Sequence, residues 1–247
     1  MDSYFYLLVV EFAFAGLVFL MLFFISAPYG KFLRKGWGLS LPAKYSWLIM
    51  ELPAVLFISF YFYISKGWEN PVLIIFYVIW QSHYLFRTFV YPFTMGGKNK
   101  PYPFILVIFA IVFNSLNGSI NGHFIFQANE YSSDWLLSPA FIGGFTLFII
   151  GYAINKQSDF ILKNLRKKSD TYTIPYGGLF KWISNPHYFG EILQWLGWAI
   201  LTWSTAGFAF ACFTFANLFP RAISNHKWYK EQFDNYPRRK AIIPFIV

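Results

Sequence analysis

Seven apolar stretches, each close to the length of a membrane-spanning helix, dominate this chain of 247 residues. A helix needs about 20 apolar residues to cross the hydrocarbon core of a bilayer. Only 13% of the residues are charged, against roughly 25% in a soluble domain, so the chain cannot cover itself in water. Long continuous runs favour helices over a barrel. We predict an all-α polytopic membrane protein, one domain over residues 1–247, with spans at residues 4–26, 45–65, 71–92, 103–120, 139–162, 188–203 and 207–224.

Basic residues occur in alternate loops between these stretches. Lysine and arginine collect in residues 27–44, 93–102 and 163–187 and after residue 224, whereas the other loops hold Lys66 alone. By the positive-inside rule the basic loops and the C-terminus are cytoplasmic, so the N-terminus lies outside and the number of spans is odd. The net charge of +9 then reflects topology and anionic lipid, and no nucleic-acid partner is expected. We expect the endoplasmic reticulum membrane for a eukaryotic chain and the inner membrane for a bacterial one.

A cytoplasmic tail is expected from about residue 225. It mixes aromatic residues with charges and closes in the apolar run 241–247. We expect this run to pack against the helical bundle or against the membrane surface.

Ionisable side chains at membrane depth are costly unless paired or hydrated, so each is a candidate functional residue. Glu51 precedes Pro53, whose missing N–H frees a backbone carbonyl and favours a kink toward a cavity. A protonated structural glutamate, bonded to a neighbouring helix, is the alternative for Glu51 and the favoured interpretation for Glu11.

Three asparagines in the fourth stretch are explained equally well by helix–helix hydrogen bonding and by ligand binding. These are Asn114, Asn117 and Asn121.

The third stretch carries more polar side chains than a lipid-facing helix tolerates. The residues recur at helical spacing, which indicates a site lining the bundle, with a structural hydrogen-bond network as the alternative. One face holds Gln81, Tyr84, Thr88 and Tyr91, and the flank holds His83 and Arg87.

Polar residues also gather in the fifth and sixth stretches. Asn155, Asp159 and Arg166 share one face near the cytoplasmic end, where the planar fork of arginine would suit phosphate. A basic run at this position is equally a topology signal. In the sixth stretch Glu191 and Gln194 are expected to point inward, one turn apart.

Common fingerprints for metals and nucleotides are missing from the sequence. Cys212 is the single cysteine, and the four histidines are scattered, so we predict neither a disulfide nor a metal site. No glycine-rich dinucleotide or P-loop fingerprint occurs. A nucleotide cofactor would therefore have to lie among the helices.

Taken together, several segments resemble the steroid 5α-reductase family, integral-membrane reductases that use NADPH to reduce enones. The resemblance covers the chain from the first cytoplasmic loop to its end. The segment 185–191 alone also resembles isoprenylcysteine carboxyl methyltransferases and sterol reductases. The matching segments are residues 47–53, 83–84, 87–91, 100–103, 155–159, 165–167, 174–180, 189–191, 221–222, 236–237 and 240–246.

The resemblance implies an active site and a reaction. Glu51 and Tyr84 would act on the C3 carbonyl of a 3-oxo-Δ4 steroid near Trp47, while NADPH delivers hydride to C5. The lipophilic steroid would reach its pocket from the bilayer, and no obligate protein partner is expected. Residues implied around NADPH are Tyr29, Tyr91, Lys100, Asn155, Asp159, Arg166, Glu191, Arg221 and Tyr229, with Glu191 nearest the nicotinamide amide.

Three positions depart from the family pattern, so the resemblance assigns no cofactor contact to Thr173, His187 or Asn225. Within reductases, enoyl-CoA thioesters and polyprenols are the rival substrates. Methyl transfer from S-adenosylmethionine by an isoprenylcysteine-type enzyme is a rival chemistry, and a non-catalytic channel or transporter is a third class.

Overall fold

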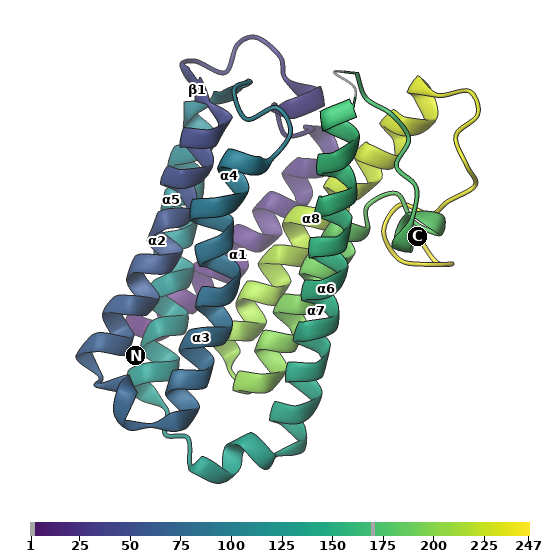
Figure 1. Ribbon diagram of the computed structural model, residues 1–247. Coiled ribbons are helices and arrows are strands. Elements are labelled where there is room, and N and C mark those ends of the chain that lie inside the picture. The colour runs from purple at the N-terminus through teal and green to yellow at the C-terminus, as the bar shows by residue number, and fades with distance from the viewer. Residues whose placement is uncertain (1–2, 169–170) are drawn as a thin grey trace.

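Each of the seven apolar stretches forms helix in the computed structural model, which describes residues 3–168 and 171–247 (Figure 1). The third stretch is divided by a π-helical turn, Phe86–Val90, and a second π turn, Phe124–Ala128, extends the fourth. The helices are α1 Ser3–Phe24, α2 Ala43–Ile64, α3 Pro71–Leu85, α4 Tyr91–Thr94, α5 Phe104–His123, α6 Pro139–Lys168, α7 Pro186–Thr202 and α8 Thr205–Gln232.

Six of these helices are long and apolar enough to cross a membrane, with α3, its π turn and α4 counted as one. The chain is thus suited to several membrane passes. The sixth predicted span corresponds to α7, which has 17 residues, so a seventh crossing stays a prediction. α8 continues two turns beyond residue 224, where the last span was expected to end.

Two short strands lie at the end of the bundle predicted to be cytoplasmic. β1 (Ser40–Pro42) pairs antiparallel with β2 (Pro101–Pro103), with Leu41 opposite Tyr102. Each strand leads directly into a helix, α2 or α5, so the pairing brings the start of these two helices together. The prediction of an all-α chain is therefore correct for the bundle and omits this small sheet.

Helix starts follow the residues that favour them. The Asn70 side chain accepts a hydrogen bond from the Val72 N–H at 2.8 Å, and Pro71 occupies the first position of α3. Ser204 accepts from the Gly207 N–H at 2.9 Å at the start of α8. Side-chain caps of this kind satisfy amides that have no partner within the helix.

α6 and α7 pack with their backbones almost in contact. A Cβ atom added at Gly190 would lie 2.6 Å from the Asn155 nitrogen, and one at Gly197 would lie 2.5 Å from the Phe148 nitrogen. Glycines allow this approach because small residues let membrane helices pack closely. The glycine seam consists of Gly144 and Gly151 on α6 and Gly190 and Gly197 on α7.

Aromatic rings fill the interior between α3, α7 and α8. Trp80, Trp195 and Trp198 are each at most 1% exposed. The Trp80 ring stacks on Tyr84 at 5.0 Å, and the Trp80 Nε1 donates to the Ala54 carbonyl at 3.1 Å. This packing fixes the position of the Tyr84 ring from several sides.

α1 packs against α5 and α8 and leaves most of its side chains on the outer surface. Glu11 is fully buried there, yet neither carboxyl oxygen has a hydrogen-bond partner among the described residues. The expected bond from Glu11 to a neighbouring helix is therefore absent among the described residues. Aromatic contacts hold α1 against α8, as in those of Phe12 with Phe208 and Phe14 with Phe213.

The glycine seam predicts a contrast between two adjacent residues. Gly144→Ala would drive a Cβ into the Leu201 nitrogen and to 2.8 Å from the Gly197 carbonyl oxygen, whereas a Cβ at Gly143 meets nothing within 4 Å. We expect Gly144→Ala to destabilise the protein by about 1–3 kcal/mol. Gly143→Ala should be neutral or slightly stabilising, because alanine favours helix. Thermal unfolding in one detergent compares them, and equal melting temperatures would contradict the seam.

Candidate active site

Two cavities adjoin inside the bundle and share Tyr29 and Arg221 in their walls. The first, about 580 Å³, is here called the basic cavity: five basic side chains and one acidic side chain line it. The second, about 480 Å³, is called the apolar cavity and is walled mainly by aromatic and aliphatic side chains. The charged lining of the basic cavity comprises Lys31, Lys156, Lys163, Arg166, Arg221 and Asp159.

The apolar cavity receives the residues predicted to act on the substrate. Trp47 and Glu51 come from α2, and Tyr84 comes from α3. Asn114 of α5 donates to the Met50 carbonyl at 2.6 Å, which fixes α2 beside Glu51. The family resemblance implied that these three side chains share one site, and the fold brings them into the wall of one cavity.

Tyr84 is 3% exposed, and its hydroxyl makes no hydrogen bond to any residue in 3–168 or 171–247. The ring is held between Trp80 and Trp195, at centroid distances of 5.0 and 5.6 Å. The hydroxyl is therefore a positioned donor that is free for a ligand in the apolar cavity.

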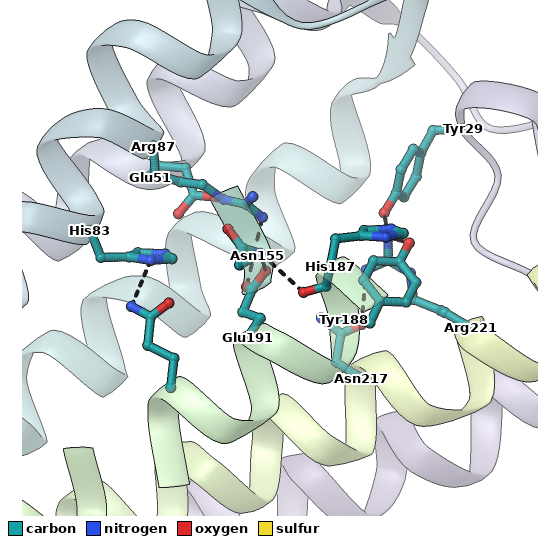
Figure 2. A network of polar contacts seen from close by, with 11 residues as sticks. Tyr29, Glu51, His83, Arg87, Asn155, His187, Tyr188, Glu191, Asn217 and Arg221 are labelled. Carbon is teal, nitrogen blue, oxygen red and sulfur yellow. Dashed lines mark hydrogen bonds and ion pairs between the residues drawn. The ribbon is translucent and has the colours of Figure 1, made fainter. Parts of the chain in front are cut away.

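Arg87 connects the predicted catalytic residue to a predicted cofactor residue (Figure 2). Its Nε lies 3.3 Å from the Glu51 Oε1, and its Nη2 lies 3.8 Å from the Glu191 Oε1. The guanidinium also lies over Trp47 at 4.4 Å and Tyr91 at 5.2 Å. The Arg87 guanidinium thus holds the Glu51 carboxyl group in position at the wall of the apolar cavity.

The sequence analysis named Arg87 on the flank of a candidate site but predicted no partner for it, although a signal existed. An arginine in the middle of an apolar stretch needs a buried partner, and Glu51 and Glu191 were both candidates. The π turn that begins at Phe86 helps to place Arg87, because the residue inserted in such a turn changes the direction of the following side chains relative to Tyr84. Such turns are frequent at functional sites.

The polar flank of α3 is bonded into the bundle. Gln81 donates from Nε2 to the Val55 carbonyl at 3.1 Å, and Gln194 lies 2.9 Å from the His83 Nδ1. Thr88 is fully buried with no partner for its hydroxyl among the described residues. Gln81 thus fits the structural alternative. His83, although it is bonded to Gln194, lines the apolar cavity together with Tyr84 and Arg87.

α6 and α7 supply the boundary between the cavities. Asn155 donates to the His187 carbonyl at 3.0 Å and to the Glu191 Oε2 at 3.4 Å (Figure 2). The Asn155 Oδ1, the Asp159 Oδ2 and the His187 Nδ1 are buried without partners among the described residues. Asp159 and His187 line the basic cavity, so it presents polar atoms that a polar ligand would satisfy.

Arg221 lies where the cavities meet. Its Nη2 donates to the hydroxyls of Tyr29 and of Tyr188, the latter at 3.1 Å, and its Nη1 donates to the Asn217 Oδ1 at 3.5 Å (Figure 2). These partners come from three separate segments, so one guanidinium joins the first loop, α7 and α8.

Cations stack on aromatic rings at the mouth of the basic cavity. The Arg166 guanidinium lies 3.4 Å from the ring centre of Tyr172, and Lys31 lies 4.0 Å over Trp228 and 4.2 Å over Tyr229. Burial and the nearby Arg166 lower the pKa of Lys31 to about 7. An anionic group would stabilise the protonated form of this lysine.

Most of the residues implied around a cofactor line the basic cavity, and three lie outside its wall. Lys100 lies outside its wall but 5.7 Å from the Tyr172 ring, and Glu191 lines the apolar cavity. Asn155 stands behind both, bonded to Glu191. No role was predicted for Lys31, because a lysine in a basic loop is usually a topology signal. The remaining six of the nine residues implied around a cofactor all line the basic cavity. They are Tyr29, Tyr91, Asp159, Arg166, Arg221 and Tyr229.

Comparison with known proteins gives one consistent result. The family model described as 3-oxo-5-alpha-steroid 4-dehydrogenase matches residues 100–247. The chain is 39% identical over 248 residues to 3-oxo-5-alpha-steroid 4-dehydrogenase 1 of Bos taurus, covering 96% of this chain and 95% of the relative. It is 40% identical to the Homo sapiens protein of that name over 229 residues, 90% and 86% of the two chains. A plant relative, Steroid 5-alpha-reductase DET2 of Gossypium hirsutum, is 38% identical over 91% of this chain and 90% of its own.

These relatives match the chain over nearly its whole length, and the family model begins at Lys100 and includes α5 to α8. Most of the segments that suggested the resemblance contribute a residue to the wall of one of the two cavities, whereas 174–180, 236–237 and 240–246 contribute none. The chain therefore belongs to the 3-oxo-5-alpha-steroid 4-dehydrogenase, or steroid 5-alpha-reductase, family of oxidoreductases.

Proposed function

We propose that this protein reduces the 4,5 double bond of 3-oxo-Δ4 steroids to the 5α-dihydro products with NADPH. The observation that carries the proposal is Arg87, which holds Glu51 of the apolar cavity and Glu191 of the cofactor boundary in one ion-pair network. A substrate carbonyl beside Glu51 and Tyr84 would thus lie next to a nicotinamide beside Glu191.

The apolar cavity suits a rigid, hydrophobic substrate. Leu17 and Met21 of α1 and Phe109 of α5 line it, and they are also about half exposed on the outer surface of the bundle, at 53%, 49% and 51%. A surface of this kind would face lipid acyl chains, so a steroid could pass between α1 and α5 without crossing water. This supports access from the bilayer.

The basic cavity fits a dinucleotide that carries an extra phosphate. Lys31, Lys163 and Arg166 supply positive charge at its mouth, and Asp159 provides an acceptor deeper inside. Arginine binds phosphate oxygens with two parallel hydrogen bonds, which favours NADPH over NADH at Arg166. When bound, NADPH supplies the hydride.

Tyr84 and the Arg87 network would then lower the barrier to reduction. Negative charge moves onto the carbonyl oxygen as an enolate when C5 is reduced, and the Tyr84 hydroxyl is positioned to donate to that oxygen. Glu51 would orient this donor and the ring of the substrate, while Arg87 balances its charge. Aromatic side chains around Tyr84 exclude water from the developing charge.

The proposed orientation places the basic cavity on the cytoplasmic side, with the N-terminus outside and α7 as a seventh crossing. Basic residues at that side of the bundle support it. The membrane would be the endoplasmic reticulum in a eukaryote and the inner membrane in a bacterium.

The central test is reduction of testosterone or progesterone by the purified protein with NADPH, followed by mass spectrometry. We expect a gain of two hydrogens at the 4,5 double bond. An unchanged mass for every 4-ene-3-ketone tried, together with reduction of an enoyl-CoA or a polyprenol, would move the assignment to that substrate class. Methylation of a prenylated thiol would replace the reductase proposal altogether.

Tyr84→Phe removes the proposed donor and keeps the aromatic packing. Turnover should fall by about 10²–10³-fold, because one donor to a developing oxyanion contributes that much. NADPH binding, measured by fluorescence titration, should be unchanged. The matched control is Tyr77→Phe on the same helix, which loses a 3.2 Å hydrogen bond with Ser59 and touches neither cavity. Equal activity in the two variants would remove Tyr84 from catalysis.

NADPH affinity should depend on pH through Lys31. Its pKa is lowered to about 7, so it is charged below that pH and neutral above it. Because phosphate prefers the ammonium, the Kd should rise as pH increases, by up to about tenfold per unit above the pKa. Lys31→Arg stays charged throughout and should flatten the profile. Parallel profiles for the two proteins would exclude Lys31 from the phosphate site.

A further inference from the structure

The end of the chain forms a hydrogen-bonded strap on the side of the bundle, beside α6 (Figure 1). The Lys240 N–H donates to the Trp182 carbonyl at 2.9 Å, and the Ser184 N–H donates to the Lys240 carbonyl at 2.8 Å. Asn185 donates from Nδ2 to the Ala241 carbonyl at 2.9 Å, and Ile242 is fully buried. These contacts fix the strap to the start of α7.

This strap exposes large apolar side chains. Phe245 is 77% exposed and Ile246 68%, and the partly exposed Trp182 lies 6.2 Å from the Phe245 ring. The Phe245 backbone is left-handed, with φ 67°, a region that residues with a Cβ rarely adopt. A hydrogen bond from Ile246 N–H to the Ile243 carbonyl, at 3.2 Å, closes this turn. The turn directs two hydrophobic side chains away from the protein.

Positive charges lie in the same two segments as these apolar side chains. Lys181, Arg238 and Lys240 are exposed, and residues 171–185 and 236–247 contain no acidic residue. The Lys181 Nζ lies 5.5 Å from the Trp182 ring. We call the exposed set of Trp182, Phe245, Ile246, Lys181, Arg238 and Lys240 the tail patch.

The tail patch lies at the depth where a bilayer would end. About 20 residues of α6 cross the hydrocarbon core, so from Pro139 its boundary falls near Asp159. Gly178, four residues before Trp182, packs against α6 close to this boundary, since a Cβ atom added there would lie 2.5 Å from the Gln157 Oε1. Tryptophan and lysine are typical of this interface.

We propose that the tail patch inserts into the cytoplasmic leaflet, with Trp182, Phe245 and Ile246 at the boundary of the acyl chains and the cations on anionic phospholipid headgroups. The strap is thereby a second membrane attachment besides the spans. It follows from exposure, charge and depth, and it does not require the proposed reaction. Amphipathic elements with lysine or arginine beside apolar side chains bind membranes in this way.

Site-directed spin labelling tests the proposal on the full chain in vesicles of phosphatidylcholine and phosphatidylglycerol. A label is attached at Ile246→Cys in a Cys212→Ser background, with Glu231→Cys as the control, since Glu231 is 57% exposed at the end of α8. We expect the ratio of oxygen to nickel-chelate accessibility to be severalfold higher at position 246 than at 231, because oxygen concentrates in the bilayer. Equal ratios at the two positions would overturn the proposal.

Two further measurements test whether a second copy of the chain covers the tail patch and whether anionic lipid attracts it. Dipolar broadening of the 246 signal that vanishes on dilution with unlabelled protein would mean that a second copy covers the patch, which also overturns the proposal. Replacing Lys181 and Lys240 by glutamate should lower the ratio at 246 in vesicles with phosphatidylglycerol and much less in pure phosphatidylcholine. A label at Trp182→Cys repeats the test if Ile246→Cys fails to fold, judged by gel filtration and melting temperature.

Discussion

The Arg87 guanidinium lies between two carboxylates, at a depth where an unpaired charge is costly by several kcal/mol. Glu51 stands on α2, Arg87 follows α3 and Glu191 stands on α7, so the pairing is complete only when three helices are in register. Removing one partner would leave a charge buried in a poorly solvated place. This ion-pair network therefore fixes the relative positions of the three helices around the site. Its charged groups also lie where a bound ligand could contact them.

The two cavities differ in the chemistry of their walls, and the boundary between them is polar. Arg221, held by Tyr29 and Tyr188, and Glu191, held by Asn155, both stand at this boundary. A hydrophobic molecule on one side and a phosphate-bearing molecule on the other would meet there. This arrangement would let a chain with few charges carry out the proposed reaction, between a hydrophobic substrate and a charged nucleotide, inside a membrane.

Local properties of the sequence were sufficient to predict the helices, because hydropathy and length decide where a membrane helix forms. They could not predict the pairing of β1 with β2, which joins three-residue segments about sixty positions apart. The ion pair of Glu51 with Arg87 spans 36 positions, and the choice of facing side chains depends on tertiary packing. Arg87 could have been found, since its depth alone demanded a partner. The role of Lys31 could not have been found, because the two rings closest to it, Trp228 and Tyr229, are distant in the sequence.

The glycine seam has a consequence for how the molecule can be altered. α6 and α7 carry Asn155, Asp159 and Glu191, and their touching backbones leave no room for one helix to slide along the other. α1, by contrast, is held at the periphery by side-chain packing and supplies several side chains to the apolar cavity. Engineering of the proposed substrate range should therefore start from α1, where the wall of the apolar cavity can be reshaped while the basic cavity is left intact.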